Sequence, residues 1–260
     1  MPTDPQILDA AAAMLDARIG LHPDPSFRPR LARALLDVAA DRAIELPRLA
    51  STLGADASLL DDLTDRVTVQ ETAFFRHKEH FDALRDLLAS IGRDTVRVWS
   101  TACANGQEPY SIAMVLAELG CDGAVLATDV SPAAVTRAAA ARYADREMAG
   151  VSDGRRRRHF EAIDGEWQVR PHVRDLVRVR RHNMLDVVPP EVGACQVVFC
   201  RNVLIYLTPA HARSFLARLA DAMGPDALLF IGGAETLWHV TDRFEAVAAG
   251  GCFVYRRKRS

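Results

Sequence analysis

The chain has 260 residues and a formal net charge of −2, with 32 Lys and Arg against 34 Asp and Glu. This near balance argues against nonspecific binding to nucleic acid or to an anionic membrane as the main activity. A hydrophobic content of 49% is typical of a soluble globular protein with a sizeable core. Each apolar run is shorter than the roughly 20 residues that a membrane-spanning helix needs.

The N-terminus carries one apolar run, at 10–15, which Asp9 and Asp16 bound. Such a run is too short and too acidic for a signal peptide. The five cysteines form no CxxC pair, and no histidine stands at metal-ligand spacing from them. We therefore expect reduced thiols, no metal site and a cytoplasmic protein.

Residues 4–66 read as helical. Asp4 and Pro5 are a typical N-cap and first-turn pair for a helix that ends near residue 18. A second helix is indicated by apolar residues at helical spacing: Leu31, Leu35, Val38 and Ala39. Pro47 and Gly54 punctuate two further short helices. With no strand pattern before residue 95, we expect residues 1–68 to form a small helical domain.

From residue 95 the pattern changes to strands that alternate with helices, which predicts a parallel sheet in a second domain, 69–260. The expected strands are 96–100, 124–128, 176–180, 196–200, 227–231, 244–247 and 252–255. The link between the last two is too short for a parallel crossover, so they should pair antiparallel. The fold class is therefore α/β, with a seven-stranded, mostly parallel sheet. A short β-hairpin insert is expected near 160–172.

The turn between the first expected strand and the next helix reads S-T-A-C-A-N-G-Q-E-P-Y-S at 100–111. A strand, a turn of small residues and a helix is how doubly wound sheets open a nucleotide site. The turn has no GxGxxG, and it places Glu108 at the helix start. A carboxylate there suits a ligand with positive charge and hydroxyls, such as S-adenosylmethionine, better than a pyrophosphate. The alternative is that Glu108 is an ordinary first-turn acid.

Polar residues also follow the next strands. Asp129 ends the second strand, about 20 residues after the glycine turn, where an acid can accept both ribose hydroxyls. It is alternatively the N-cap of a helix that begins at Pro132. Asn183 and Met184 end the third strand and offer an amide and an apolar side chain to an adenine. The alternative for Asn183 is a turn residue. These positions share one rim of the sheet, where open α/β folds bind ligands.

Several segments, in order over about 65–256, resemble the CheR family of chemotaxis methyltransferases. They are Q-E-T-A-F-F-R at 70–76, the region 99–114, A-T-D at 127–129, H-N-M-L at 182–185, F-C-R-N-V-L-I-Y at 199–206 and G-G-A-E at 232–235. The resemblance implies a class I methyltransferase (Rossmann-like) fold behind a helical domain. It also implies that S-adenosylmethionine is the methyl donor and that S-adenosylhomocysteine is the product.

The resemblance implies a role for each matching residue. Thr72 and Arg76 would line the methionine end of the cofactor, and Arg76 and Tyr206 would flank the transferring methyl group. The remaining cofactor-binding positions would be Gln70, Ala102, Glu108, Asp129, Asn183, Met184, Arg201 and Asn202. The family usually has Asn where this chain has Gln70, which is one methylene longer. Ala102 is small enough to keep the backbone open to a ligand.

The implied reaction is methylation of glutamate side chains on the cytoplasmic helices of chemoreceptors. Membrane contact would then come only through the receptor, and we expect a monomer. In the family a β-hairpin can dock on a pentapeptide tether at the receptor's end. The matching segment here, 160–169, is short and has one glycine, so we expect methylation to be independent of such a tether.

Two other classes of function are open. The first is an enzyme of the same fold with another acceptor, such as a small molecule or a nucleic-acid base. A base methyltransferase would carry an Asn/Asp-Pro-Pro-Tyr loop, whereas this chain has R-N-V-L at 201–204. A non-catalytic sensor of the cofactor would not need a reactive site, yet Arg76, Glu108, Asp129 and Tyr206 are all present. Two further features read as structural. The arginine run 155–158 is interpreted as a solvated helix face, and Glu235 as a loop acid at the pocket edge.

Overall fold

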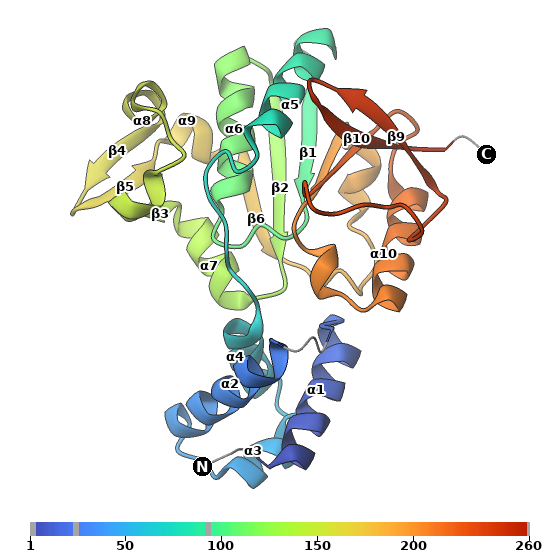
Figure 1. Ribbon diagram of the computed structural model, residues 1–260. Coiled ribbons are helices and arrows are strands. Elements are labelled where there is room, and N and C mark those ends of the chain that lie inside the picture. The colour runs from blue at the N-terminus through green and yellow to red at the C-terminus, as the bar shows by residue number, and fades with distance from the viewer. Residues whose placement is uncertain (1–3, 23–25, 92–94, 259–260) are drawn as a thin grey trace.

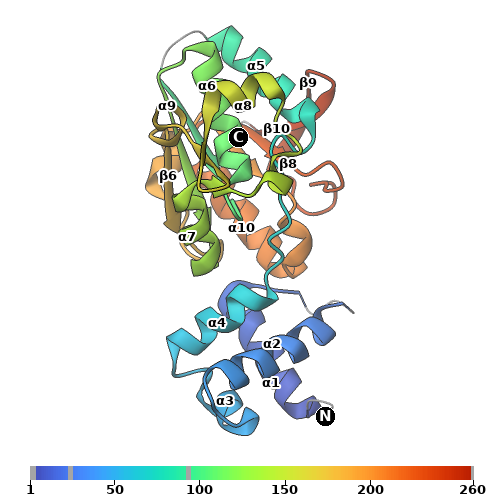
Figure 2. The ribbon, with the colours of Figure 1, turned by 90° about the vertical axis from the view of Figure 1, so that its left-hand side faces the viewer.

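The computed structural model describes residues 4–22, 26–91 and 95–258. A bundle of short helices lies below an α/β unit that contains the large sheet (Figure 1). The view turned by 90° shows the same separation, with the bundle beyond one end of the sheet (Figure 2). The expected α/β class is confirmed.

Four helices form the bundle: α1 (Pro5–Ile19), α2 (Phe27–Asp41), α3 (Leu46–Thr52) and α4 (Ala57–Val67). The Asp4 carboxylate caps α1 as predicted, because it accepts a hydrogen bond from the backbone N–H of Gln6 at 2.9 Å. The predicted stripe on α2 is fully buried and packs against α1 and α4. This core gives the bundle its own hydrophobic centre.

The large sheet has the strand order β6-β2-β1-β7-β8-β10-β9. Its strands are β1 (Val96–Ser100), β2 (Gly123–Asp129), β6 (Val177–Arg181), β7 (Val197–Cys200), β8 (Leu228–Ile231), β9 (Phe244–Ala249) and β10 (Cys252–Arg257). The first five run parallel, and β10 is antiparallel to both β8 and β9. All seven predicted strands are confirmed, with ends shifted by at most a few residues.

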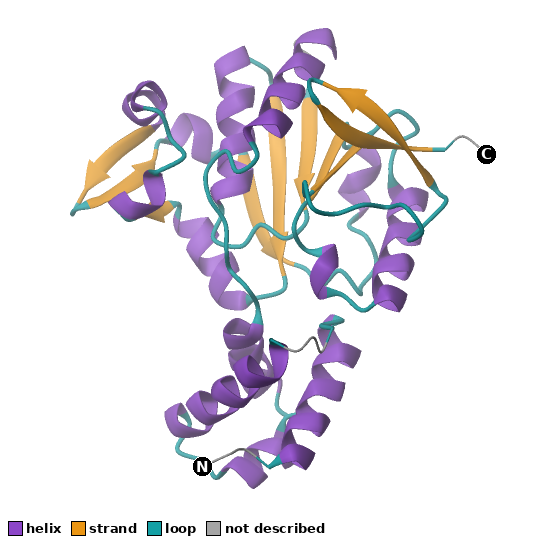
Figure 3. Cartoon of the chain, viewed as in Figure 1, coloured by secondary structure: helices purple, strands orange, loops and turns teal. Residues whose placement is uncertain are grey.

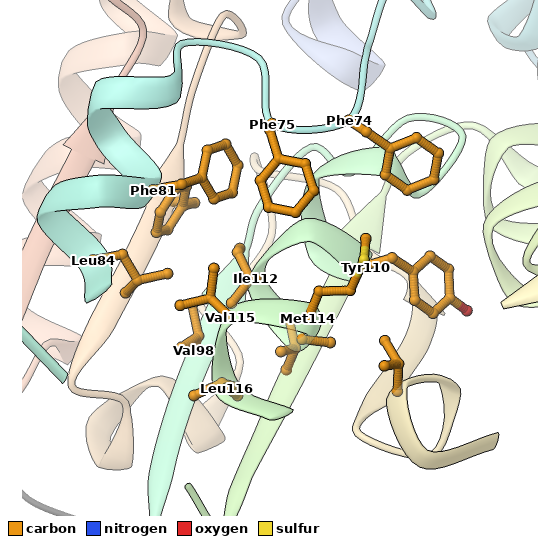
Figure 4. Close-up of a cluster of buried hydrophobic side chains, with 14 of the residues drawn as sticks. Phe74, Phe75, Phe81, Leu84, Val98, Tyr110, Ile112, Met114, Val115 and Leu116 are labelled. Atoms are coloured by element: carbon orange, nitrogen blue, oxygen red, sulfur yellow. The ribbon is translucent and has the colours of Figure 1, made fainter. Parts of the chain in front are cut away.

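Helices cover both faces of the sheet (Figure 3). Both faces need cover because successive side chains of a strand point to opposite faces: Val98 and Trp99 of β1 lie on different faces, and both are fully buried. On one face α5 (Lys78–Ile91) and α6 (Gln107–Leu119) supply Phe81, Leu84, Ile112 and Val115 to the cluster in Figure 4. On the other face α10 (Pro209–Ala222) packs against β7 and β8. Helix α7 (Pro132–Ala140) lies against β2 and β6.

A second, three-stranded sheet lies at the side of the α/β unit (Figure 1). Its order is β3-β5-β4, all antiparallel, from β3 (Arg142–Tyr143), β4 (Phe160–Ile163) and β5 (Glu166–Val169). The hairpin β4–β5 turns at Asp164 and Gly165, which have φ of 52° and 81°. Short helices α8 (Asp153–His159) and α9 (Pro171–Arg174) flank it, and the 3₁₀ turns are η1 (Asp145–Met148), η2 (Pro190–Ala194) and η3 (Leu204–Tyr206).

The arginine run on α8 is not simply a solvated face. Arg157 and Arg158 are exposed, as expected. Arg155 and Arg156 are only half exposed, and each lies over an aromatic ring. The prediction was wrong for these two because a run of like charges says nothing about which of its members meet partners from distant segments. None of the helices in the described part of the chain is long and apolar enough to cross a membrane.

Candidate functional site

A pocket lies between the carboxyl ends of the parallel strands and the helical bundle. The bundle contributes Ile19, Leu21 and Arg30 to its lining, and the loop after α4 closes one side. The pocket brings together every residue that the sequence singled out: Gln70, Thr72, Arg76, Ala102, Glu108, Asp129, Asn183, Met184, Arg201, Asn202 and Tyr206. Four of the five segments that carry these residues lie at or after the ends of β1, β2, β6 and β7, and they meet because parallel strands end at the same edge. The fifth segment, 70–76, comes from the loop between α4 and α5.

The turn after β1 brings backbone close to the pocket. Gly106 adopts φ of 95°, and a Cβ at this position would lie 2.8 Å from the Tyr143 hydroxyl. Glycine is therefore required for both its backbone conformation and its lack of a side chain. The neighbouring backbone N–H of Ala104 donates to the Asp129 carboxylate at 2.9 Å. The turn and the end of β2 are thus fixed to each other.

Asp129 is a buried carboxylate at the end of β2. Its second oxygen accepts a hydrogen bond from the backbone N–H of Ser131 at 3.0 Å. Burial raises the pKa of Asp129, and the hydrogen bonds from Ser131 and Ala104 act against that shift. Each oxygen keeps a lone pair after these contacts, so the carboxylate can still accept two hydroxyls from a ligand.

Glu108 and Arg201 form a buried ion pair in the pocket wall. One Glu108 oxygen accepts from the Arg201 guanidinium at 3.1 Å, and the other accepts from the Ser100 hydroxyl at 2.7 Å. Burial raises the pKa of Glu108 and lowers that of Arg201, while each charge stabilises the other. Arg201 also donates to the backbone carbonyl of Arg76. Arg201 lines the pocket, and its Nε is buried without a partner among the described residues.

The segment before α5 carries Arg76 at the pocket. Its guanidinium donates to the Glu71 carbonyl at 3.0 Å and lies 3.2 Å from the Glu71 carboxylate. The side chain is about one-third exposed, at 31%. Phe75 and His77, on either side, both have positive φ, of 53° and 62°. Such backbone is strained for bulky residues, so tertiary contacts must hold it.

Two predicted cofactor contacts look different in the structure. The Asn183 amide donates to the Arg18 carbonyl at 2.6 Å and accepts from the Leu185 N–H at 3.0 Å. It therefore makes the turn contact considered as its alternative, and both ends of its amide are bonded to the protein rather than free for a ligand. Gln70 donates to the Thr68 hydroxyl, whereas its Oε1 is buried without a partner among the described residues. That oxygen is free to accept from a ligand's amino group.

Glu235 is a residue whose role the sequence analysis missed. Its carboxylate accepts backbone hydrogen bonds at 2.7–3.0 Å from four donors: Asn202, Val203, Leu204 and Gly232. A Cβ at Gly232 would lie 2.7 Å from the Glu235 carboxylate, which explains the glycine before it. The motif G-G-A-E was visible in the sequence, but the partner loop lies about 30 residues earlier. Glu235 thus shapes the loop that carries Asn202 and Tyr206.

These features fit S-adenosylmethionine. Asp129 suits the two ribose hydroxyls, and the unpaired Gln70 oxygen suits the ammonium of the methionine part. The unpaired Arg201 Nε suits its carboxylate. Small side chains at Ala102 and Ala104 let the backbone approach the ligand.

Comparisons with known proteins agree with this fit. The family described as "CheR methyltransferase, SAM binding domain" matches residues 70–251. "Chemotaxis protein methyltransferase 1" of Pseudomonas aeruginosa is 34% identical over 77% of this chain and 78% of its own. "Chemotaxis protein methyltransferase" of Vibrio parahaemolyticus is 34% identical over 88% and 82%. "Probable biofilm formation methyltransferase WspC" of Pseudomonas putida is 38% identical over 85% of this chain and 54% of its own. The chain belongs to the CheR methyltransferase family and is an S-adenosylmethionine-dependent methyltransferase.

Proposed function

We propose that this enzyme methylates glutamate side chains on the cytoplasmic helices of chemoreceptors. The products are glutamate methyl esters and S-adenosylhomocysteine, and the purpose is adaptation in chemotaxis-type signalling. The relatives that carry the name of chemotaxis protein methyltransferase support the substrate class. The observation that carries the proposal is the partly exposed Arg76 guanidinium in the lining of the pocket. An anionic acceptor is the substrate that such a group binds best.

The chemistry requires alignment rather than a general base. A glutamate side chain has an ordinary pKa of about 4.3, so at pH 7 it is already the nucleophilic carboxylate. Bound S-adenosylmethionine supplies a methyl group activated by a sulfonium. Arg76 orients the incoming carboxylate and keeps it ionised, and the Tyr206 hydroxyl contributes a second hydrogen bond. Holding reacting groups near attack distance can lower a barrier by roughly 7–11 kcal/mol.

The pocket wall contributes to the electrostatics. Glu108 is paired with Arg201, so this part of the wall is neutral overall even though it contains two charges. The helical bundle covers the carboxyl ends of the strands and supplies apolar lining through Ile19 and Leu21. Water excluded from this space would strengthen the attraction between the anionic acceptor and the sulfonium. We expect the bundle to be part of the active site for this reason.

We also propose that methylation does not depend on a receptor tether. The hairpin β4–β5 has four residues in each strand and a two-residue turn, so its exposed edge is short. A docked peptide strand would gain few backbone hydrogen bonds from such an edge. Calorimetry with a peptide that copies the receptor C-terminus should show no tight binding. A submicromolar dissociation constant would contradict this part of the proposal.

The test of the reaction uses methyl-labelled S-adenosylmethionine and receptor-bearing membranes from the protein's own source. Base treatment of the labelled membranes should release volatile labelled methanol, because methyl esters of carboxylates are hydrolysed by base. A receptor whose candidate glutamates are changed to alanine serves as the control and should stay unlabelled. Base-stable label would show methylation of nitrogen or carbon and would refute the proposal.

A further inference from the structure

The ring of Phe75 is held between a cation and another ring. The guanidinium carbon of Arg155, on α8, lies 3.9 Å from the Phe75 ring centroid. Phe81, on α5, meets the same ring edge-on, with the centroids 5.2 Å apart. Phe75 is buried, and its ring points from the loop toward Ile112 on α6 (Figure 4). A desolvated contact between arginine and an aromatic ring is worth more than an exposed one.

Arg155 is itself fixed in place. Its Nε and Nη2 donate to the two oxygens of Glu118, on α6, at 2.7 and 2.9 Å. Such a two-point contact sets the plane of the guanidinium as well as its position. Glu118 also accepts from Arg85 and lies 3.3 Å from the Nε2 of the buried His159. Burial opposes its charge most strongly, but the hydrogen bonds from Arg155, His159 and Arg85 together hold the pKa of Glu118 well below its usual range.

The preceding residue is anchored from the same side of the molecule. Phe74 packs edge-on against Tyr143 of β3 and Phe160 of β4, with centroids 4.8 and 5.5 Å away. A Cβ at Gly150 would lie 2.0 Å from the Phe74 carbonyl oxygen, so the two backbones touch. Contacts with the small sheet and with α8 therefore hold Phe74 and Phe75, the two residues that directly precede Arg76, in place.

We propose that Arg155 is a positioning residue for methyl transfer. It stacks on Phe75 and so keeps the strained backbone at Phe75 and His77 in the one conformation that presents Arg76 to the pocket. Two hydrogen bonds fix the same segment as well: the Phe75 N–H donates to the Ser111 hydroxyl of α6 at 3.0 Å, and Arg201 donates to the Arg76 carbonyl. This inference rests on the proposed role of Arg76 in binding the acceptor.

The experiment compares Arg155→Met, which keeps length and apolar bulk, with Arg157→Met as the control. Arg157 is an exposed arginine of the same helix. We expect Arg155→Met to lower kcat at least tenfold and to leave the dissociation constant for S-adenosylhomocysteine within threefold of that of the parent protein. Arg155→Lys should recover only part of the rate, because an ammonium lacks the planar fork. The Arg157→Met variant should match the parent protein.

A second measurement does not depend on the acceptor. Hydrogen exchange of the backbone amides of Phe75 and Arg76 should be at least tenfold faster in Arg155→Met than in the control. If receptor membranes are not methylated even by the parent protein, the proposed substrate fails, while this exchange rate still decides the role of Arg155. Exchange and kcat equal to those of the control would overturn the inference. So would a lower melting temperature with kcat unchanged.

A double-mutant comparison separates action through Phe75 from a general effect on folding. In a Phe75→Leu background the ring is absent, so Arg155→Met should change kcat by less than threefold. The same tenfold loss in both backgrounds would show that Arg155 acts independently of Phe75 and would overturn the inference. If the Phe75→Leu protein does not fold, Phe75→Met, which also lacks the ring, serves instead, and Arg155→Met should again change kcat by less than threefold there.

Discussion

Arg76 and Tyr206 line the same pocket but offer a carboxylate two different interactions. A hydrogen bond to a charged group contributes about 1.5–3 kcal/mol, whereas a neutral hydroxyl contributes about 1 kcal/mol. We therefore expect Arg76→Ala to lower kcat by roughly 100-fold and Tyr206→Phe by less than tenfold, since 1.4 kcal/mol corresponds to a factor of ten. Steady-state assays of methyl transfer check this ranking. Equal and mild losses would show that neither residue orients the acceptor.

The buried His80 makes the stability of the fold depend on pH. It is 4% exposed, stacks on His77 and meets Phe230 edge-on. Burial, and next the charge of Arg201, lowers the pKa of His80 to about 4 from its ordinary 6.5. Between pH 6.5 and about pH 4, His80 is protonated in the unfolded chain but neutral in the native state, so the free energy of unfolding falls as the pH falls. At about 1.36 kcal/mol per pKa unit the loss is roughly 2–3 kcal/mol.

Urea unfolding at pH 7 and pH 4.5 measures this loss. We expect the free energy of unfolding of His80→Leu to fall less over that interval than that of the parent protein. The remaining fall in the variant comes from other groups, among them His77 and His172, whose pKa values burial also lowers. Parallel changes in the two proteins would show that His80 titrates normally in the folded state.

At the scale of elements, the loop 202–206 depends on one carboxylate from a distant loop. Glu235→Gln keeps the shape but replaces one acceptor oxygen by an N–H₂ donor, which then faces backbone N–H groups. We expect the free energy of unfolding to fall by about 2–4 kcal/mol, the loss of one or two hydrogen bonds to a charged group. Chemical denaturation checks this value. Glu245→Gln is the control, because Glu245 pairs with Arg256 at the surface and should cost under about 1 kcal/mol.

Elements with a strong local pattern could be predicted from the sequence. The seven strands of the large sheet were visible as short apolar or alternating runs between turn signals, and the hairpin β9–β10 was visible because its link is too short for a parallel crossover. The two-residue strand β3 has no such pattern and exists only because β5 pairs with it. The same reason applies to Arg155 and Glu235. Apart from Gly232 beside Glu235, the partners of these side chains lie 30 or more residues away, and a local pattern does not encode such contacts.

At the scale of the whole molecule, the sequence predicted at which edge of the sheet the pocket lies, but not that the helical bundle forms its other wall. Parallel strands end at one edge, so polar residues after β1, β2, β6 and β7 had to converge there. No comparable rule predicts where the helical bundle lies. Its position at that edge follows from contacts between segments far apart in the chain, such as the hydrogen bond from the Asn183 amide to the Arg18 carbonyl. Pocket residues such as Ile19 and Arg30 were therefore missed.

The contacts between bundle and sheet involve the cofactor site directly. Asp65, on α4, accepts hydrogen bonds from the Ser131 hydroxyl and from the Ala133 N–H. The N–H of the same Ser131 donates to Asp129. Asp61, one turn earlier on α4, pairs with Arg181 at the end of β6. Helix α4 therefore holds the loop that orients the buried carboxylate predicted to bind the ribose.

Asp65→Asn should consequently weaken cofactor binding without touching the cofactor. It removes a charged acceptor that holds Ser131, so Asp129 loses part of its orientation, and a contribution of about 1–1.5 kcal/mol corresponds to a 5- to 10-fold higher dissociation constant. Calorimetry with S-adenosylhomocysteine measures it. Asp62→Asn is the matched control, because Asp62 lies on the same helix but pairs with Arg42 inside the bundle. Equal affinities for the two variants would mean that the bundle covers the pocket without tuning it. A selective loss in Asp65→Asn would mean that the bundle tunes cofactor affinity, because Asp65 holds the loop next to the carboxylate predicted to bind the ribose.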